Sequence, residues 1–156
     1  MAKIIYIIGD ATNPQIPGQK IITHICNDIG AWGAGFVLAL SKRWEQPENS
    51  YRAIKNYVLG AVDLVPVEDD ILVANMIAQH GIGIANDGTP PVRYDAVEEC
   101  LDMVNIVATG MHASIHMPRI GCGLAGGNWM EIEKIINETF GDDIRVYVYD
   151  LPEKNK

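Results

Sequence analysis

The sequence predicts an α/β fold, a three-layer α/β/α sandwich around a mixed, mostly parallel central sheet. Short apolar runs typical of strands alternate along the chain with segments of helical periodicity. One such run, at residues 71–79, is apolar nearly throughout, as expected of a strand buried on both faces. Two glycine clusters stand where a strand gives way to a helix. This alternation favours a sheet enclosed between helical layers.

In the N-terminal part, residues 3–8 (KIIYII) form a β-branched run ended by Gly9-Asp10, and we expect a buried strand there. Residues 20–26 (KIITHIC) predict a second strand. After the first glycines, apolar side chains recur at helical spacing at Phe36, Val37, Leu40 and Trp44. Residues 46–58 predict another helix, with Pro47 near its start and one face formed by Tyr51, Ile54 and Val58.

In the middle of the chain, residues 61–68 and 71–79 predict a pair of strands. Pro66 makes the first of them an edge strand or a bulged strand, because proline has no N–H to donate to a ladder. Residues 80–91 (HGIGIANDGTPP) are expected to form a loop.

In the C-terminal part, residues 93–112 show helical periodicity, and residues 113–120 predict a strand. A helix follows the second glycine cluster, with Asn128 as N-cap and Glu131 at capping-box spacing. Residues 143–150 predict a final strand.

The length of 156 residues suits one domain, predicted at residues 1–151, with a short polar tail at 152–156. The formal net charge of −8 argues against a nucleic-acid polymer as partner, because such partners need clustered Lys and Arg. It leaves room for one small phosphate ligand held by backbone N–H groups.

The three cysteines are odd in number and form no CxxC pair, so neither a disulfide framework nor a zinc site is indicated. We expect reduced thiols and a cytoplasmic location. No apolar run approaches the length of about 18 residues that a membrane span requires, so no membrane partner is expected. No spacing of His, Asp or Cys indicates a metal, and no cofactor is expected.

The two glycine clusters predict a binding site. Residues 30–36 (GAWGAGF) contain three glycines, and residues 121–127 (GCGLAGG) contain four in seven positions. A tight turn needs one or two glycines, so the second cluster favours close approach of the backbone to a ligand, while the first alone fits an ordinary loop equally well. Ligands of open α/β sheets bind beyond the carboxyl ends of strands. Two helix N-termini there would hold an anion without Lys or Arg.

Four segments together resemble the macrodomain family: GDAT (9–12), THICNDIGAWGAGF (23–36), ANMIAQ (74–79) and MPRIGCGLAGGNW (117–129). Their order and spacing match over nearly the whole chain. The resemblance is nearest to compact macrodomains that process ADP-ribose-1″-phosphate and to terminal ADP-ribose glycohydrolases. It implies a macrodomain-like fold and ADP-ribose, or a close derivative, as the small-molecule ligand.

The resemblance also implies roles for particular residues. Asp10 is similar to the acceptor of the adenine amine, with the Ala11 backbone beside it, and Asn27 to the asparagine at the distal ribose. Tyr149 resembles the aromatic residue near adenine, although a surface tyrosine fits its place equally well. The first diphosphate loop corresponds to Gly33, Ala34, Gly35, Phe36 and Val37. The second corresponds to Ile120, Gly121, Cys122, Gly123, Leu124 and Ala125.

The chemistry stays open between hydrolysis and binding. The glycohydrolase branch uses a lysine and an aspartate where this chain has Gln79 and Ala125. His24 and Asp28 are the candidate catalytic groups for hydrolysis of an ADP-ribosyl ester or of ADP-ribose-1″-phosphate. A strand histidine bonded to backbone and a loop-capping aspartate are the structural alternatives. The competing functions are a non-catalytic reader of ADP-ribose or of an ADP-ribosylated protein, and a dinucleotide oxidoreductase on a Rossmann-like sheet.

Overall fold

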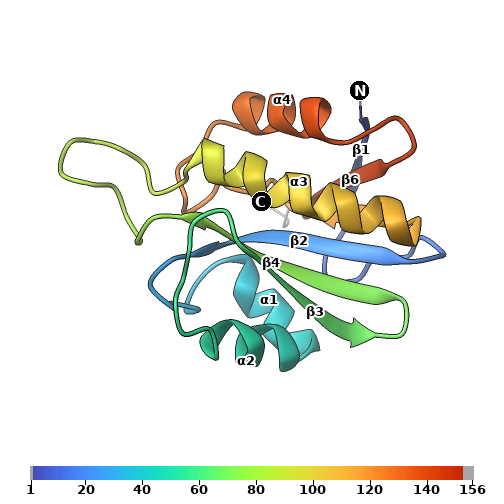
Figure 1. The fold of residues 1–156 in the computed structure, drawn as a ribbon, viewed down its shortest axis with the longest axis horizontal. Helices are drawn as coiled ribbons and strands as arrows, with labels where there is room; N and C mark the ends of the chain where they lie inside the picture. Colours follow the sequence, from blue (N-terminus) through green and yellow to red (C-terminus); the bar gives the residue numbers. More distant parts are fainter. Residues whose placement is uncertain (1, 153–156) are drawn as a thin grey trace.

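A six-stranded sheet forms the centre of the protein in the computed structural model, which describes residues 2–152 (Figure 1). The strands lie in the order β1-β6-β5-β2-β4-β3, and all neighbours are parallel except the antiparallel pair β3 and β4. Their bounds are β1 Lys3–Ile8, β2 Lys20–Asn27, β3 Val62–Glu68, β4 Ile71–Gln79, β5 Ser114–Met117 and β6 Arg145–Asp150. The sheet is therefore mixed and mostly parallel, as predicted.

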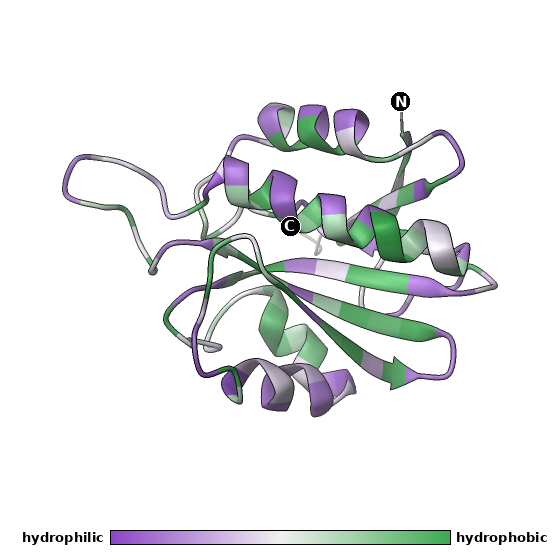
Figure 2. Ribbon diagram, in the orientation of Figure 1, coloured by the Kyte–Doolittle hydropathy of each residue, from purple (hydrophilic) through white to green (hydrophobic). Residues whose placement is uncertain are grey.

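Helices cover both faces of this sheet (Figure 1). α1 (Phe36–Arg43) and α2 (Gln46–Arg52) pack on one face, and α3 (Tyr94–Met111) and α4 (Trp129–Thr139) pack on the other. The side chains of β2 alternate between the layers: Ile22 and Cys26 join the core under α1, whereas Ile21 joins the core under α3. Figure 2 shows β4 as mostly hydrophobic and α2 as mostly hydrophilic. The three-layer prediction is confirmed.

The prediction of a buried first strand is wrong. β1 has the predicted bounds, but within residues 2–152 it is an edge strand, paired with β6 alone. Its side chains are largely accessible, and Ile8 is 70% exposed. Apolar composition alone does not separate an edge strand from a central one, because both favour β-branched residues.

Two elements are shorter than predicted. α2 ends at Arg52 rather than at Val58, and the Tyr57 hydroxyl donates a 3.0 Å hydrogen bond to the carbonyl of Tyr51, which a continuing helix would use itself. β5 ends at Met117, because Pro118 has no N–H to continue the ladder.

Asn128 caps α4 as predicted, since its side chain accepts a hydrogen bond from the N–H of Met130. Its own N–H donates to the hydroxyl of Tyr94 at 2.9 Å and not to Glu131. The capping-box spacing is therefore present without the reciprocal bond.

Pro66 lies in β3, an edge strand with a register shift between Pro66 and Glu68, as its sequence indicates.

Within residues 2–152, no helix combines the length and apolarity needed to cross a membrane. Of the predicted polar tail at 152–156, residues 153–156 lie outside the described residues. The single domain at residues 1–151 stays a prediction.

Candidate ligand-binding cavity

A cavity of about 690 Å³ opens at the carboxyl ends of β2, β4 and β5. Residues of both glycine clusters line it. The first glycine loop is residues 30–36, and the second, which adds Ile120 to the second cluster, is residues 120–127. Its volume falls within the range of small-molecule sites, about 300–1,000 Å³. Predicted binding residues on this wall are Asn27, Gly33, Ala34, Gly35, Phe36, Val37, Ile120, Gly121, Gly123, Leu124 and Ala125.

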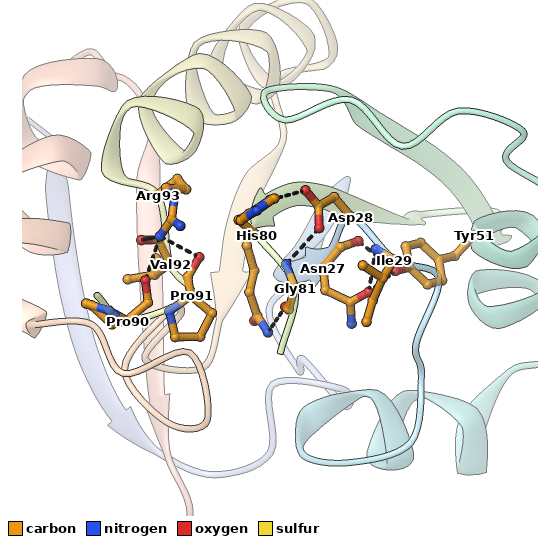
Figure 3. Close-up of polar contacts among 11 residues, drawn as sticks. Asn27, Asp28, Ile29, Tyr51, His80, Gly81, Pro90, Pro91, Val92 and Arg93 are labelled. Atoms are coloured by element: carbon orange, nitrogen blue, oxygen red, sulfur yellow. Dashed lines mark hydrogen bonds and ion pairs between the residues drawn. The ribbon is translucent and has the colours of Figure 1, made fainter. Parts of the chain in front are cut away.

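Asn27, the last residue of β2, organises the first glycine loop. Its Oδ1 accepts a hydrogen bond from the N–H of Ile29 at 3.1 Å (Figure 3). The same oxygen accepts from the N–H of Ala31 at 3.0 Å, and Nδ2 of Asn27 donates to the carbonyl of Ala31 at 2.8 Å. The buried hydroxyl of Tyr51 donates to the same residue, 2.6 Å from its carbonyl and 2.8 Å from Oδ1. An amide has two N–H hydrogens, and Ala31 takes one of those on Asn27.

Trp32 holds the middle of this loop inward. It is 4% exposed, and its Nε1–H donates to the Ser41 hydroxyl at 2.8 Å. Its ring meets the His24 imidazole edge to face, with centroids 5.5 Å apart. The loop then enters α1 at Gly35, whose φ of +81° is a conformation that favours glycine. A Cβ on Gly33, in contrast, would meet nothing within 4 Å.

The glycines of the second loop divide into two kinds. The N–H of Gly127 donates to the carbonyl of Gly121 at 2.6 Å, and a Cβ on Gly127 would collide with that oxygen. Gly121 has a φ of +74°. These two glycines are required by the turn itself. Gly123 lines the cavity, and a Cβ there would meet nothing within 4 Å, so the turn does not require it.

Among the described residues on the cavity wall, Arg119 carries the only full charge. Its guanidinium makes a bidentate ion pair with Asp150, at 2.8 and 2.9 Å, which raises the pKa of Arg119 and lowers that of Asp150. It also lies over the rings of Tyr6 and Trp129, 5.1 and 5.2 Å from their centroids. Its charge is therefore already compensated by Asp150.

His24 lies on the cavity wall within β2 and is 2% exposed. Its Nε2 is 2.5 Å from Oδ1 of Asn75, a fully buried residue of β4. Burial disfavours the charged imidazolium and lowers the pKa of His24 to about 4, against the opposing effect of Asn75. The imidazole is accordingly neutral at pH 7 and is able to accept a proton.

Asp28 lies outside the cavity lining and holds the loop that follows β4. Its carboxylate accepts 2.7 Å hydrogen bonds from the N–H of Gly81 and from Nδ1 of His80 (Figure 3). Partial burial would raise the pKa of Asp28, but these two bonds outweigh it and leave the pKa lowered. His80 itself is largely exposed. The structure thus separates the two candidate catalytic groups.

Four predicted binding residues also lie outside the lining. Asp10 accepts hydrogen bonds from the N–H and the hydroxyl of Thr12, as in an Asx turn. Ala11 and Tyr149 are buried in one small cluster, and the Tyr149 hydroxyl pairs with Nδ1 of His116 at 2.7 Å. Cys122 is half-buried, and burial raises its pKa, which makes it a poor nucleophile.

Part of the cavity wall is not predicted by the sequence. Ile82 and Gly83, from the loop after β4, line the cavity beside Gln79. Gly81 and Gly83 both have positive φ, and their place after a central strand was the available signal. Arg119 was missed because its direction depends on Asp150, on a different strand. Within residues 2–152, no group of three or more His, Cys, Asp or Glu side chains could hold a metal ion.

A mostly parallel sheet between helical layers, with two glycine loops around one cavity at its carboxyl edge, defines a class of small-ligand-binding domains. A structure of a macrodomain protein from Streptomyces coelicolor is 47% identical to this chain, with a TM-score of 0.82, and the match covers 95% of this chain and 99% of the other. This chain belongs to the macrodomain family. A search for a matching family model found none.

Three further matches bear on the function. A structure of a protein of unknown function from Bacteroides thetaiotaomicron is 55% identical, with a TM-score of 0.92, over 96% of this chain and 98% of the other. The ADP-ribose 1″-phosphate phosphatase of Candida albicans is 28% identical over 92% of this chain and 97% of its own length. The chain also matches the mouse chromodomain-helicase-DNA-binding protein 1-like, at 32% identity over 94% of this chain, but spans only 18% of that protein.

Proposed function

We propose that this macrodomain binds ADP-ribose, or a close derivative, in the cavity between its two glycine loops. The observation that carries the proposal is that both glycine loops line one cavity whose single cation is already paired, and we assign the backbone N–H groups of these loops to the ligand. Such a surface suits a diphosphate, because oriented amides stabilise an anion without placing bare positive charge in the protein.

Three parts of the ligand, its diphosphate, distal ribose and adenine, are assigned to particular residues. The diphosphate lies between Gly33–Gly35 and Gly121–Gly123, and the remaining amide hydrogen of Asn27 donates to a hydroxyl of the distal ribose. We assign the adenine to the side of the molecule that carries Asp10, Ala11 and Tyr149. These residues lie near one another because β1, which precedes Asp10, pairs with β6, which contains Tyr149.

We further propose that the protein hydrolyses a phosphate or carboxylate ester on the distal ribose. For ADP-ribose-1″-phosphate, a water oxygen forms a bond to phosphorus as the bond from phosphorus to the ribose oxygen breaks. The water proton passes to neutral His24, and the leaving oxygen takes up a proton from solvent, giving ADP-ribose and inorganic phosphate. His24 then returns its proton to solvent. Amides of the glycine loops stabilise the negative charge that develops. The name of the Candida albicans relative supports this substrate class.

A non-catalytic reader is the second candidate, and a specific observation favours it. Gln79 and Ala125, where the glycohydrolase branch has its lysine and aspartate, both line the cavity as uncharged side chains. Asp28, in addition, is occupied by His80 and Gly81.

Calorimetric titration tests the binding proposal. ADP-ribose should bind more tightly than NAD, and tighter binding of NAD would instead support a dinucleotide oxidoreductase. Turnover tests the second step, with ADP-ribose-1″-phosphate and a glutamate-ADP-ribosylated protein as substrates. A His24→Gln variant should bind ADP-ribose but release phosphate or ADP-ribose at a rate at least tenfold lower. ADP-ribose binding with no turnover by the wild type would leave the reader.

A further inference from the structure

A chain of buried and half-buried polar groups contacts His24 and takes no part in the cavity wall. Asn75, on the neighbouring strand β4, is paired with His24 in the sheet register and is fully buried. Its Oδ1 lies 2.5 Å from Nε2 of His24, and its Nδ2 lies 3.0 Å from the carbonyl of Pro47 and 3.2 Å from Oδ2 of Asp63. The Ser50 hydroxyl donates to the same Asp63 carboxylate at 2.8 and 3.0 Å.

The partners of Asn75 determine which way its amide faces. A backbone carbonyl and a carboxylate only accept hydrogen bonds, so the group that faces Pro47 and Asp63 must be the NH₂ group with its two hydrogens. The carbonyl oxygen of Asn75 is thereby turned toward His24. An amide oxygen only accepts, and therefore Nε2 of His24 must carry a hydrogen.

We propose that Asn75 is a positioning residue that holds His24 in the tautomer with its proton on Nε2 and its lone pair on Nδ1. A neutral imidazole has one hydrogen, so Nδ1 is left as an acceptor on a ring that lines the cavity. The thiol of Cys26, a weak donor, lies 3.9 Å from Nδ1 and 3.8 Å from Nε2. The catalytic meaning of this tautomer rests on the proposed function, whereas the tautomer itself does not.

His116 provides a contrast within the same sheet. It is also fully buried, but its ring nitrogens face two hydroxyls, Ser114 at 2.7 Å and Tyr149 at 2.7 Å. Each hydroxyl donates or accepts as required, so its partners do not select a tautomer. His24 faces an amide oxygen whose direction is fixed by two further acceptors.

Nitrogen-15 NMR of the histidine-labelled protein tests the proposal without substrate. Two-bond couplings from the ring carbon-bound hydrogens to each nitrogen distinguish the tautomers, and His24→Gln assigns the signals by their loss. At pH 7 we expect a protonated Nε2 and an unprotonated Nδ1 for His24. A hydrogen on Nδ1, or rapid exchange between both tautomers, would overturn the proposal.

A charge-conserving swap gives a second test. The double variant Asn75→Asp with Asp63→Asn moves the carboxylate next to His24 while keeping one carboxylate and one amide, and Asp63→Asn alone is the control. Other groups around the ring are the Cys26 thiol and the uncharged Trp32 and Phe36 rings. The NMR titration midpoint of His24 should rise by about 1–3 pH units in the swap. A folded swap variant that titrates like the control would contradict the contact.

Kinetics then separates the positioning of His24 by Asn75 from the role of His24 in hydrolysis. If His24 is the base, the acid limb of kcat should move upward with the NMR midpoint in the swap variant, with little change in KM. If the NMR results hold but the acid limb does not move, Asn75 positions His24 as proposed and the role of His24 in hydrolysis is wrong.

Discussion

Replacing Gly33 by glutamate should weaken ADP-ribose binding without weakening the fold. Gly33 lines the cavity, a Cβ there meets nothing within 4 Å, and its φ is not in the left-handed region. The new carboxylate would lie roughly 5 Å from a bound diphosphate. Coulomb repulsion between two unit charges at that separation is about 0.8 kcal/mol at the dielectric constant of water and about 3 kcal/mol at an effective value near 20. The dissociation constant should therefore rise about 4-fold to about 150-fold.

Calorimetry with ADP-ribose measures this change, and urea unfolding checks the fold. Gly141→Glu is the matched control, because Gly141 also has open space around a Cβ but does not line the cavity. The control should bind within about twofold of the wild type, and the Gly33 effect should shrink as salt is raised. Unchanged affinity in Gly33→Glu, or equal losses in both variants, would refute the placement of the diphosphate.

Three further predictions concern stability. Gly127→Ala should destabilise the protein by about 2 kcal/mol or more in urea unfolding, because its Cβ would collide with the carbonyl of Gly121, whereas Gly110→Ala, with open space on α3, should be neutral or stabilising. Tyr51→Phe should lower the unfolding free energy by about 1–3 kcal/mol, since Asn27 loses a buried donor; a change below about 0.3 kcal/mol would show that this bond is unimportant. Burial lowers the pKa of both His24 and His116 from 6.5 to about 4. Between these pH values the unfolded chain therefore binds more protons than the folded protein. The free energy of unfolding should accordingly fall as the pH drops from 6.5 to 4, by about 3 kcal/mol per histidine. Chemical denaturation across this range, with His116→Phe losing part of the slope, measures the effect, and a flat profile would contradict it.

The fold was predictable because its elements leave strong local signals. β4 is apolar nearly throughout and is central, and Pro66 marks β3 as an edge. The exposure of β1 was not predictable, because its apolar run resembles that of a buried strand and its position depends on β6 at the other end of the chain. The end of α2 depends on a tyrosine hydroxyl six residues beyond Tyr51, which periodicity does not reveal.

The candidate site divides in the same way. The two glycine loops were recognisable from composition and spacing, and the structure places both on one cavity. The surroundings of His24 were not recognisable from the sequence, because Asn75 lies 51 positions away in the chain and takes its orientation from Pro47 and Asp63. Asp28 follows Asn27 directly, yet its carboxylate is directed to the loop after β4, since Gly81 and His80 offer donors there.

The most direct test of the account is an amide-resolved NMR titration of the protein with ADP-ribose. If amide hydrogens of two converging loops hold the diphosphate, the largest shift changes should fall on residues 33–36 and 120–124 together, at one common dissociation constant. Saturable binding that perturbs only one of these loops, or neither, would contradict the account.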